Sequence, residues 1–546
     1  MTLGVGYSNS AREERAMHGG EPSVHFINSV LVTVVVALFV LWRYRLAILG
    51  GMMQGEGAAL PLPAECAPVQ TALGTGNLAA HERSMRQRIA AAWLLTTAIC
   101  GLPMAVAYMV AGEMSASPTY ALALTCSYMI AALPMIAVSL SWPLRRIVVA
   151  FFVMLLSFAA LCLIAGVIER SLHGRPLGWK ILGLVPLFFD IAWNQLWMAG
   201  LFWLLSWPTR LRGVVPITFA ALLVFAAAPF AGARLTAVLA ASEVGTPWVY
   251  TLGLNGVFML IALPVGWLAW LRLGKLAADY EAKRFSDAQL LARTWWLMLV
   301  VTIGFDILAG RERPIFALLL VVGQIVLFPL VNHWVMRWLG VARLATAAPA
   351  PTLLLLRVFG YTARTERLFD RVASRWRLLG PVTTIAAPDV TARTIDPGDY
   401  LRWLTGRIDE LFVTTRASLE AKLARLDLAP DPDGRFRINE FCCRDSTWQA
   451  TVVELMLRAD AVIMDVRGIS AARLGCEFEL QQLAKRLPPQ RLVLVVDETT
   501  DKTLLQAAFG DGLGVIRCVE MAAWWQADRV FSALLAGFSR PAHSLG

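Results

Sequence analysis

The sequence predicts an α-helical polytopic membrane domain of about nine spans, followed by an α/β doubly wound domain with a five-stranded parallel sheet. Of its 546 residues, 57% are hydrophobic and only 16% are charged, whereas about 25% charged is usual in soluble domains. Long apolar runs fill most of the chain before residue 343. After residue 351, short apolar runs alternate with amphipathic helical segments, which is typical of a parallel sheet covered on both faces.

The aromatic, charged and cysteine residues agree with this class. The 20 Trp and 25 Phe residues suit membrane interfaces. Much of the net charge of +10 lies in short loops beside apolar runs, where Lys and Arg set topology and meet anionic lipid, so we expect the bilayer and not nucleic acid as the partner. The eight cysteines form no C-x-x-C pair, which argues against a metal site or a disulfide framework and indicates a reducing compartment for the C-terminal part.

The membrane domain is expected over residues 26–343, after a polar N-terminal tail at 1–25. A helix needs about 20 mostly apolar residues to cross a bilayer. The segments of this kind are 26–45, 89–111, 119–142, 147–168, 181–206, 213–232, 249–271, 294–310 and 315–337. The first lacks a convincing cleavage site and is interpreted as a retained helix. With an external N-terminus, basic residues are more frequent in the internal loops, which predicts a cytoplasmic C-terminus.

Polar groups inside these segments leave two interpretations open. Asp190 and Asn194 lie four residues apart and therefore on one helical face, and Gln324 and Asn332 follow in a later segment. Ionisable groups within a membrane are costly and suggest a functional site such as a transport pathway. The alternative is that such groups form hydrogen bonds between helices. Asp190, which has no basic partner in its own helix, is the strongest candidate for function.

The C-terminal domain is expected over residues 352–546, after a linker of small residues and prolines at 344–351. The predicted strands are 352–358, 381–387, 461–466, 491–496 and 514–519, with helices between them. An insertion at 389–445 breaks the alternation; it contains a charged helix near 400–426 and the turn 431–435. The turn lacks the later oxygen ligands of a calcium loop and is interpreted as a plain turn. The insertion is expected to pack on the sheet edge, cap the site or contact the membrane half.

The third predicted strand and the helix after it carry the most informative residues. Asp465 and Arg467 stand at the carboxyl end of the strand, and Ser470 follows in the loop. Open α/β sheets bind ligands at the carboxyl ends of their strands. Arg357 ends the first strand, and an Arg there suits the oxygens of a pyrophosphate. No G-x-G-x-x-G or Walker sequence occurs, which argues against a Rossmann dehydrogenase and a P-loop ATPase.

This stretch resembles the Toll/interleukin-1 receptor (TIR) domain, in which a helix after the third strand carries a W-C-x-x-E-L pattern. Cys476, Glu479 and Leu480 match this pattern, whereas Gly475 replaces the tryptophan. The resemblance covers about residues 352–540. The whole chain also resembles a group of bacterial multi-pass membrane proteins that end in a TIR-like domain, with an L-R-V-F-G strand exit that includes Phe359 and a D-x-R-G-x-S loop.

The resemblance implies a signalling or defence protein in the bacterial inner (plasma) membrane. Catalytic TIR domains cleave the nicotinamide–ribose bond of NAD with the helix glutamate, which is Glu479 here. A nearby carboxylate stabilises the positive charge that develops on the ribose. The implied ligand-binding residues are Arg357, Phe359, Asp465, Arg467, Ser470 and Cys476. The resemblance implies NAD as a substrate or ligand and identifies no certain cofactor, and self-association is expected.

Two other functions stay open, since one fold carries many functions. Many TIR domains are scaffolds, in which Glu479 would only cap its helix or pair with a neighbouring Lys or Arg. The chain would then be a non-enzymatic membrane protein with an interaction module. The third alternative is a transporter that the cytoplasmic domain regulates, with Asp190 on the pathway.

Overall fold

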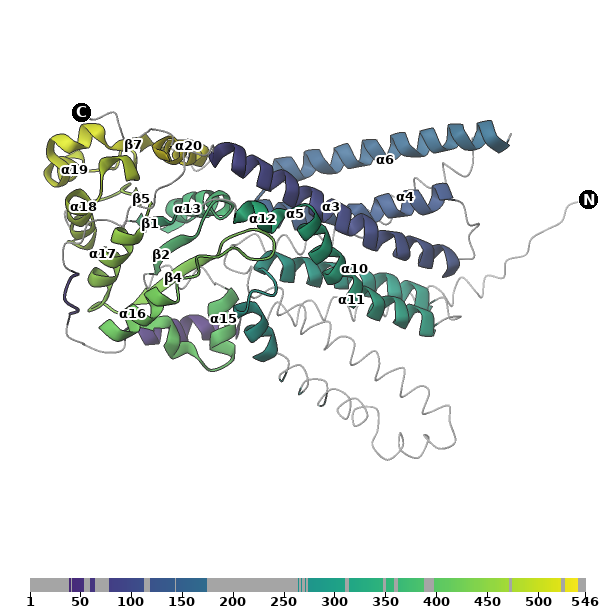
Figure 1. Ribbon diagram of the computed structural model, residues 1–546, viewed down its shortest axis with the longest axis horizontal. Helices are drawn as coiled ribbons and strands as arrows, with labels where there is room; N and C mark the ends of the chain where they lie inside the picture. Colours follow the sequence, from purple (N-terminus) through teal and green to yellow (C-terminus); the bar gives the residue numbers. More distant parts are fainter. Residues whose placement is uncertain are drawn as a thin grey trace, which may run out of the picture.

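The structure is a computed structural model in which a helical body and an α/β body lie side by side (Figure 1). The helical body contains the helices from α3 to α12, and the α/β body contains the elements from β1 to α20. The described residues are 39–40, 42–53, 59–63, 78–111, 118–142, 144–173, 264, 267, 271, 274–309, 314–346, 350–357, 362–386, 397–470, 474–521 and 526–538.

A parallel sheet of seven strands forms the centre of the α/β body, in the order β3-β4-β2-β1-β5-β6-β7. The strands are β1 (Leu353–Arg357), β2 (Val382–Ala386), β3 (Phe412–Val413), β4 (Ile438–Cys443), β5 (Ala461–Asp465), β6 (Leu492–Val496) and β7 (Arg517–Glu520). Every adjacent pair is parallel. The prediction of a parallel sheet is confirmed, and the prediction of five strands is wrong.

The two additional strands lie in the segment 389–445, which the sequence predicts to be an insertion. β4 has Asn439 and Glu440 in its first half, and these polar residues interrupt the apolar run that would mark a buried strand. β3 is only two residues long. β4 pairs with β2 from Val382↔Ile438 to Ala386↔Cys442, so this segment extends the sheet. The other five strands keep the order β2-β1-β5-β6-β7, which is the flavodoxin-like order.

Helices cover both faces of the sheet because successive strand residues point to opposite faces. Leu354 and Leu356 of β1 lie in a cluster with residues of four helices on one face. These are α16 (Arg416–Ala424), α17 (Trp448–Arg458), α18 (Leu474–Arg486) and α19 (Lys502–Phe509). Leu353 and Leu355 lie in the cluster of the other face, with α13 (Thr362–Trp376) and α20 (Ala527–Phe538). Short 3-10 turns complete the body: η2 (Ile408–Leu411), η3 (Pro489–Arg491) and η4 (Gly510–Val515).

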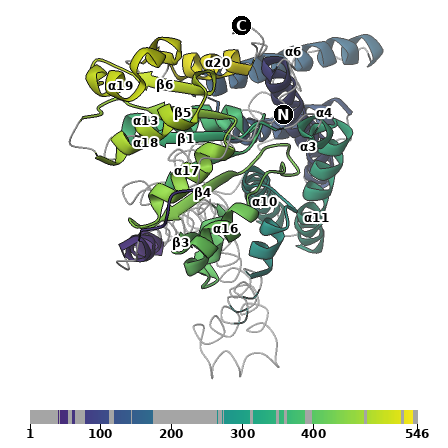
Figure 2. The same cartoon turned by 60° about the vertical axis from the view of Figure 1, so that its left-hand side comes forward.

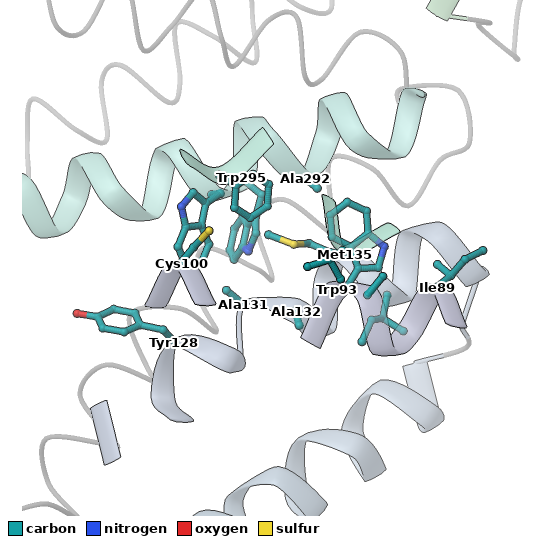
Figure 3. Packing of buried hydrophobic residues seen from close by; sticks show 14 of the residues in the cluster. Ile89, Trp93, Cys100, Tyr128, Ala131, Ala132, Met135, Ala292 and Trp295 are labelled. Carbon is teal, nitrogen blue, oxygen red and sulfur yellow. The ribbon is translucent and has the colours of Figure 1, made fainter. Parts of the chain in front are cut away.

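The described helical body packs around aromatic residues of several helices. Its helices are α3 (Leu78–Ala111), α4 (Pro118–Met129), α5 (Ala132–Leu140), α6 (Leu144–His173), α10 (Asp287–Ala309), α11 (Pro314–Trp338) and α12 (Val341–Ala345). Trp93 of α3 and Trp295 of α10 lie in one buried cluster with Met135 of α5 (Figure 3). The Trp93 indole also donates a hydrogen bond of 3.0 Å to Ser139 Oγ.

Two described helices are long and apolar enough to cross a membrane, over Leu78–Ala107 and Leu319–Trp338. The prediction of about nine spans is therefore not borne out. The predicted span 119–142 is wrong, because it divides into α4 and α5, which have 12 and 9 residues and are each too short to cross. The predicted spans 147–168 and 294–310 lie almost wholly within α6 and α10. The described residues do not include the predicted spans 181–206 and 213–232 or nearly all of 249–271. Asp190 and Asn194 therefore also lie outside the described residues.

Large apolar side chains are exposed on the outer faces of the helical body. On α6 they include Phe152 and Leu156, which are 54% and 68% exposed. On α11 they include Leu319, Leu330 and Trp334, whereas the described α/β residues after 350 expose only Leu428 and Val515 among large apolar side chains. Contiguous exposed apolar surface of this kind marks a contact with a membrane or a partner.

The polar residues Gln324 and Asn332 of α11 connect helices inside this body. Gln324 accepts a hydrogen bond of 3.1 Å from the Trp296 indole and donates one of 3.2 Å to the Cys100 carbonyl. Asn332 accepts from Gln289 at 2.9 Å and donates to Thr96 at 3.3 Å. For these two residues the interpretation as hydrogen bonds between helices is confirmed.

The turn 431–435 contacts the helical body. Contact with the membrane half is one of the three roles that the sequence predicts for the insertion. Asp433 accepts a hydrogen bond of 2.6 Å from Ser286, just before α10. Arg437 donates one of 2.7 Å to the Tyr280 carbonyl and lies over the Tyr280 ring. The turn is therefore part of the contact between the two bodies.

A helical segment near the N-terminus also contacts the α/β body. Residues 42–53 lie beside β3, as Figure 2 shows. Tyr44 packs against Tyr400 and Trp403 of α15 (Pro397–Leu404), with ring centroids 5.9 and 5.5 Å apart. The α/β body is thus held from several sides by parts of the chain that precede it.

Candidate functional site at the sheet's switch point

The candidate site lies at the carboxyl ends of β1 and β5, which are neighbours in the sheet. From β1 the chain continues to β2 on one side, and it later returns to β5 on the other. The strand order therefore reverses between β1 and β5, and open α/β sheets bind ligands in the crevice at such a point. Arg357 and Asp465 are directly opposite each other in the register of these two strands, at the carboxyl end of each.

Asp465 is the centre of a buried network. Its side chain is 1% exposed and accepts hydrogen bonds from Arg467 at 2.8 Å (Nε to Oδ1) and 2.7 Å (Nη2 to Oδ2). Thr365 of α13 donates a third bond of 2.6 Å to Oδ2, and the Arg467 amide approaches Oδ1 at 3.3 Å. The pairing is bidentate, which holds the Arg467 guanidinium in one plane. The Asp465 carboxylate thus sets the geometry of the Arg467 side chain.

Glu479 lies on the buried face of α18. Cys476, Leu480 and Leu483 occupy the same face at helical spacing and pack in the apolar cluster beneath the sheet. This face carries Glu479 inward, so that its residue exposure is only 2%. Among the residues that the structure describes, its Oε2 atom has no hydrogen-bond partner. A buried polar atom without a partner is costly and suggests a functional role.

Burial raises the pKa of Glu479 to about 8, although the positive charge of Arg357 acts in the opposite direction. Removal from water disfavours the carboxylate, and here this effect outweighs the attraction of the guanidinium. At neutral pH the Glu479 side chain is therefore mostly protonated. A cationic group next to it would favour the carboxylate form. Acidic groups with strongly raised pKa values are concentrated at functional sites.

The structure thus brings together four of the predicted site residues: Arg357, Asp465, Arg467 and Glu479. Cys476 is fully buried in the apolar cluster, a position that suits packing. Ser470 is exposed, and no described contact joins it to the four charged residues. Phe359 lies outside the described residues.

Thr365 is a member of the site that sequence reasoning missed. It lies in the first turn of α13 and is 3% exposed. Its hydroxyl reaches Asp465, which is 100 residues away in the sequence. A helix that follows the first strand of a doubly wound sheet begins at the same edge as the strand's carboxyl end, and this position is the one signal that could have identified Thr365.

The chemistry of this cluster suits an anionic or dipolar ligand. Arg357 and Arg467 are buried cations, and Glu479 is a carboxyl group whose charge depends on its surroundings. Arg groups bind phosphate oxygens in bidentate geometry. Within the described part of the chain, no group of three or more His, Cys, Asp or Glu residues could hold a metal ion.

Comparisons with protein-family models, with curated proteins and with solved structures gave no match to this chain.

Proposed function

We propose that this chain is a membrane-anchored signalling or defence protein whose α/β domain binds and cleaves NAD or a related nucleotide. The observation that carries the proposal is the buried, mostly protonated Glu479 beside Arg357 at the switch point of the sheet. The short sequence resemblance to TIR domains assigns the catalytic role to the same residue. The position in the fold and the motif are independent reasons for choosing Glu479.

The residues have distinct roles in this proposal. Arg357 and Arg467 would contact the pyrophosphate, and Asp465 would hold Arg467 in place through its bidentate pair. The nicotinamide ring of NAD is positively charged, and its approach to Glu479 would favour the carboxylate form. As the bond between nicotinamide and ribose breaks, its electron pair leaves with nicotinamide and positive charge develops on the ribose. The Glu479 carboxylate would stabilise this charge, and water would add to the ribose carbon with loss of a proton.

The membrane part of the proposal is supported by surface chemistry. Two described helices have the length and composition of a span, and the outer faces of α3, α6 and α11 expose large apolar side chains. We propose that these faces contact lipid in the bacterial inner membrane, with the α/β domain in the cytoplasm. The helical body would then anchor the domain or transmit a stimulus to it.

A second function is favoured by one observation. Both carboxylate oxygens of Asp465 already accept hydrogen bonds from groups of the protein. Such a network can fix the packing of β5, the loop after it and α13 without any ligand, as in a scaffold or interaction module. In that case the raised pKa of Glu479 would follow from its burial and would have no role in catalysis.

NAD turnover by the full-length protein in detergent tests the proposal. The full chain is the right material, because residues 42–53 and the segment before α10 pack against the α/β body. Three variants are compared with the wild type: Glu479→Gln, Glu479→Ala and Glu477→Gln. Glu477 is the matched control, since it lies on the same helix and accepts an exposed hydrogen bond of 3.2 Å from Gln481.

Loss of turnover in both Glu479 variants, with turnover kept in Glu477→Gln, is the expected result. Equal turnover in Glu479→Gln and the wild type would remove Glu479 from the mechanism. No turnover in any protein, even when clustered on vesicles, would reject catalysis and leave the scaffold function.

A further inference from the structure

A second site lies where the helical body meets the α/β body. A cavity of about 220 Å³ opens between the first turns of α3, the start of α6, and helices α13 and α20. Figure 1 shows the beginning of α3 beside α20. The cavity is lined by five arginines and two carboxylates. These are Arg83, Arg86, Arg146, Arg371 and Arg375, with Glu82 and Asp528.

The two carboxylates are already engaged by three of the arginines. Glu82 is 2% exposed and accepts hydrogen bonds from Arg375 at 3.0 Å (Nε to Oε1) and 3.2 Å (Nη2 to Oε2). Arg86 contacts the same carboxylate at 3.3 Å. Asp528 contacts Arg375 at 3.1 Å and Arg371 at 3.8 Å.

The remaining two arginines have no carboxylate among the described residues. Among the described residues, Arg83 has one hydrogen-bond partner, the Ala79 carbonyl of its own helix, to which it donates a hydrogen bond of 3.4 Å. Arg146, at the start of α6, forms no ion pair with any described residue. The cavity wall therefore carries more positive than negative charge. Like charges that line one cavity repel one another, and an anion between them reduces this repulsion.

The position of the cavity relative to the ends of the apolar helices indicates where a bound anion would come from. Arg146 precedes Val148, where the exposed apolar stripe of α6 begins, by about 3 Å of helix. On α11, the exposed Trp334 and Trp338 rings are stacked with their centroids 6.2 Å apart. Arg88 of α3 donates a hydrogen bond of 2.7 Å to the Leu339 carbonyl, so this end of α11 and the first turns of α3 share one level. Exposed Trp and Arg residues at the end of apolar helices mark the headgroup layer of a membrane.

We propose that this cavity binds a phosphate group, and that the phosphate belongs to the headgroup of an anionic phospholipid. Arg83 and Arg146 would contact its oxygens directly, while Arg86, Arg371 and Arg375 hold the wall through Glu82 and Asp528. Guanidinium groups bind phosphate oxygens in bidentate geometry, and Arg83 and Arg146 are both exposed and therefore accessible to a headgroup. A bound lipid would thereby contact both bodies at once. The choice of lipid over a soluble phosphate depends on the membrane location proposed above; the phosphate site itself does not.

Substitution of the two unpaired arginines gives a direct test. Arg83→Gln/Arg146→Gln removes two of the three excess positive charges of the lining and leaves the Glu82–Arg375 contact in place. Arg145→Gln is the matched control, because Arg145 precedes Arg146 and is exposed, but does not line the cavity. The full-length proteins are purified in detergent. Phosphatidylglycerol binding is measured by native mass spectrometry, with phosphatidylcholine as the neutral lipid, and inorganic phosphate binding is measured by calorimetry.

The expected result is saturable binding of phosphatidylglycerol that weakens at least tenfold in the double variant and remains in Arg145→Gln. Binding of inorganic phosphate alone, lost in the double variant, would support the phosphate site and overturn the lipid as its source. Equal binding of every ligand by all three proteins would overturn the site. Cell fractionation of the wild type tests the membrane location separately. A protein absent from the membrane fraction would contradict the proposed membrane location and leave the phosphate site untouched.

Discussion

Arg435 donates a hydrogen bond of 2.5 Å to Asp287, the first residue of α10, and so joins the turn before β4 to the helical body. The same guanidinium donates to Asp433 at 2.8 Å and is almost fully buried. Arg377 approaches the second oxygen of Asp287 at 3.5 Å. Because these charged groups are removed from water, the free energy of burying each one is offset only by its oppositely charged partner.

Arg435→Gln is expected to destabilise the full-length protein, because it leaves Asp287 and Asp433 without their main cation. Removal of one partner from a buried ion pair costs about 3–5 kcal/mol. The measurement is the thermal midpoint in detergent. Arg425→Gln is the control: Arg425 is exposed at the end of α16, and its loss is expected to cost less than about 0.5 kcal/mol. Equal midpoints for the two variants would show that the contact contributes little.

Gly51→Ala is expected to weaken the packing of residues 42–53 on β3. A Cβ atom at Gly51 would lie 2.2 Å from the Phe412 ring, which is 6% exposed and held by its neighbours. Overpacking of this kind costs about 1–3 kcal/mol. The adjacent Gly50 is the control, since a Cβ there has no neighbour within 4 Å, and Gly50→Ala in a helix should stabilise by up to about 1 kcal/mol. Faster proteolysis near residue 53 in Gly51→Ala alone would confirm the contact.

The sequence was sufficient for those parts of the fold in which local pattern and burial agree. The apolar strands at 353–357 and 461–465 are fully buried, and their runs of Leu, Val and Ile identify them. β4 escaped prediction because Asn439 has a structural task that no local pattern reveals: its amide side chain accepts from and donates to the backbone of Asp427. The predicted span 119–142 failed for a similar reason. The chain turns at Ile130 and Ala131, and composition alone does not mark that turn.

The charged members of the site could be predicted because each stands next to a recognisable strand end or motif. Arg357 and Asp465 both close apolar strands, and the parallel register then places them opposite each other. Thr365 is marked only by its place in the first turn of the helix after the first strand, since one Thr in a helix has no distinctive pattern of its own. The burial of Glu479 was equally hidden, because it depends on how α18 packs against the sheet.

Glu479→Gln is expected to make the protein more stable at neutral pH. The pKa of Glu479 is about 8 in the folded state, against an ordinary value of 4.5. Between these two pH values the folded state holds a proton that the unfolded state has lost, so stability falls as pH rises through this window. Each pKa unit corresponds to about 1.4 kcal/mol, so the variant should gain a few kcal/mol at pH 8 and almost nothing at pH 4.5.

The measurement for this variant is the difference in thermal midpoint from the wild type as a function of pH. The difference cancels the titration of other groups such as Asp431, whose pKa burial raises to about 6. A difference that stays constant from pH 4.5 to pH 8 would contradict the buried, protonated Glu479.

Gln324→Leu is expected to destabilise the helical body, because it removes the acceptor of the buried Trp296 indole. Trp296→Phe removes the donor and keeps an aromatic ring stacked on Phe328. In a double-mutant cycle the two changes should couple by about 0.6 kcal/mol, the average for hydrogen bonds between membrane helices, and by no more than about 1.7 kcal/mol. Additive effects would mean that the hydrogen bond contributes nothing measurable.

Labelling of Cys518 tests the proposed location of the α/β domain. Cys518 lies on β7 and is exposed, whereas Cys100, Cys442, Cys443 and Cys476 are buried. If the domain is cytoplasmic, a maleimide that cannot cross membranes should label Cys518 in inverted vesicles but not in intact spheroplasts. Cys518→Ser defines the signal, because only the label lost in this variant belongs to Cys518. Labelling of Cys518 in intact spheroplasts would place the domain outside, away from the cellular NAD pool, and would contradict the proposed function together with the topology.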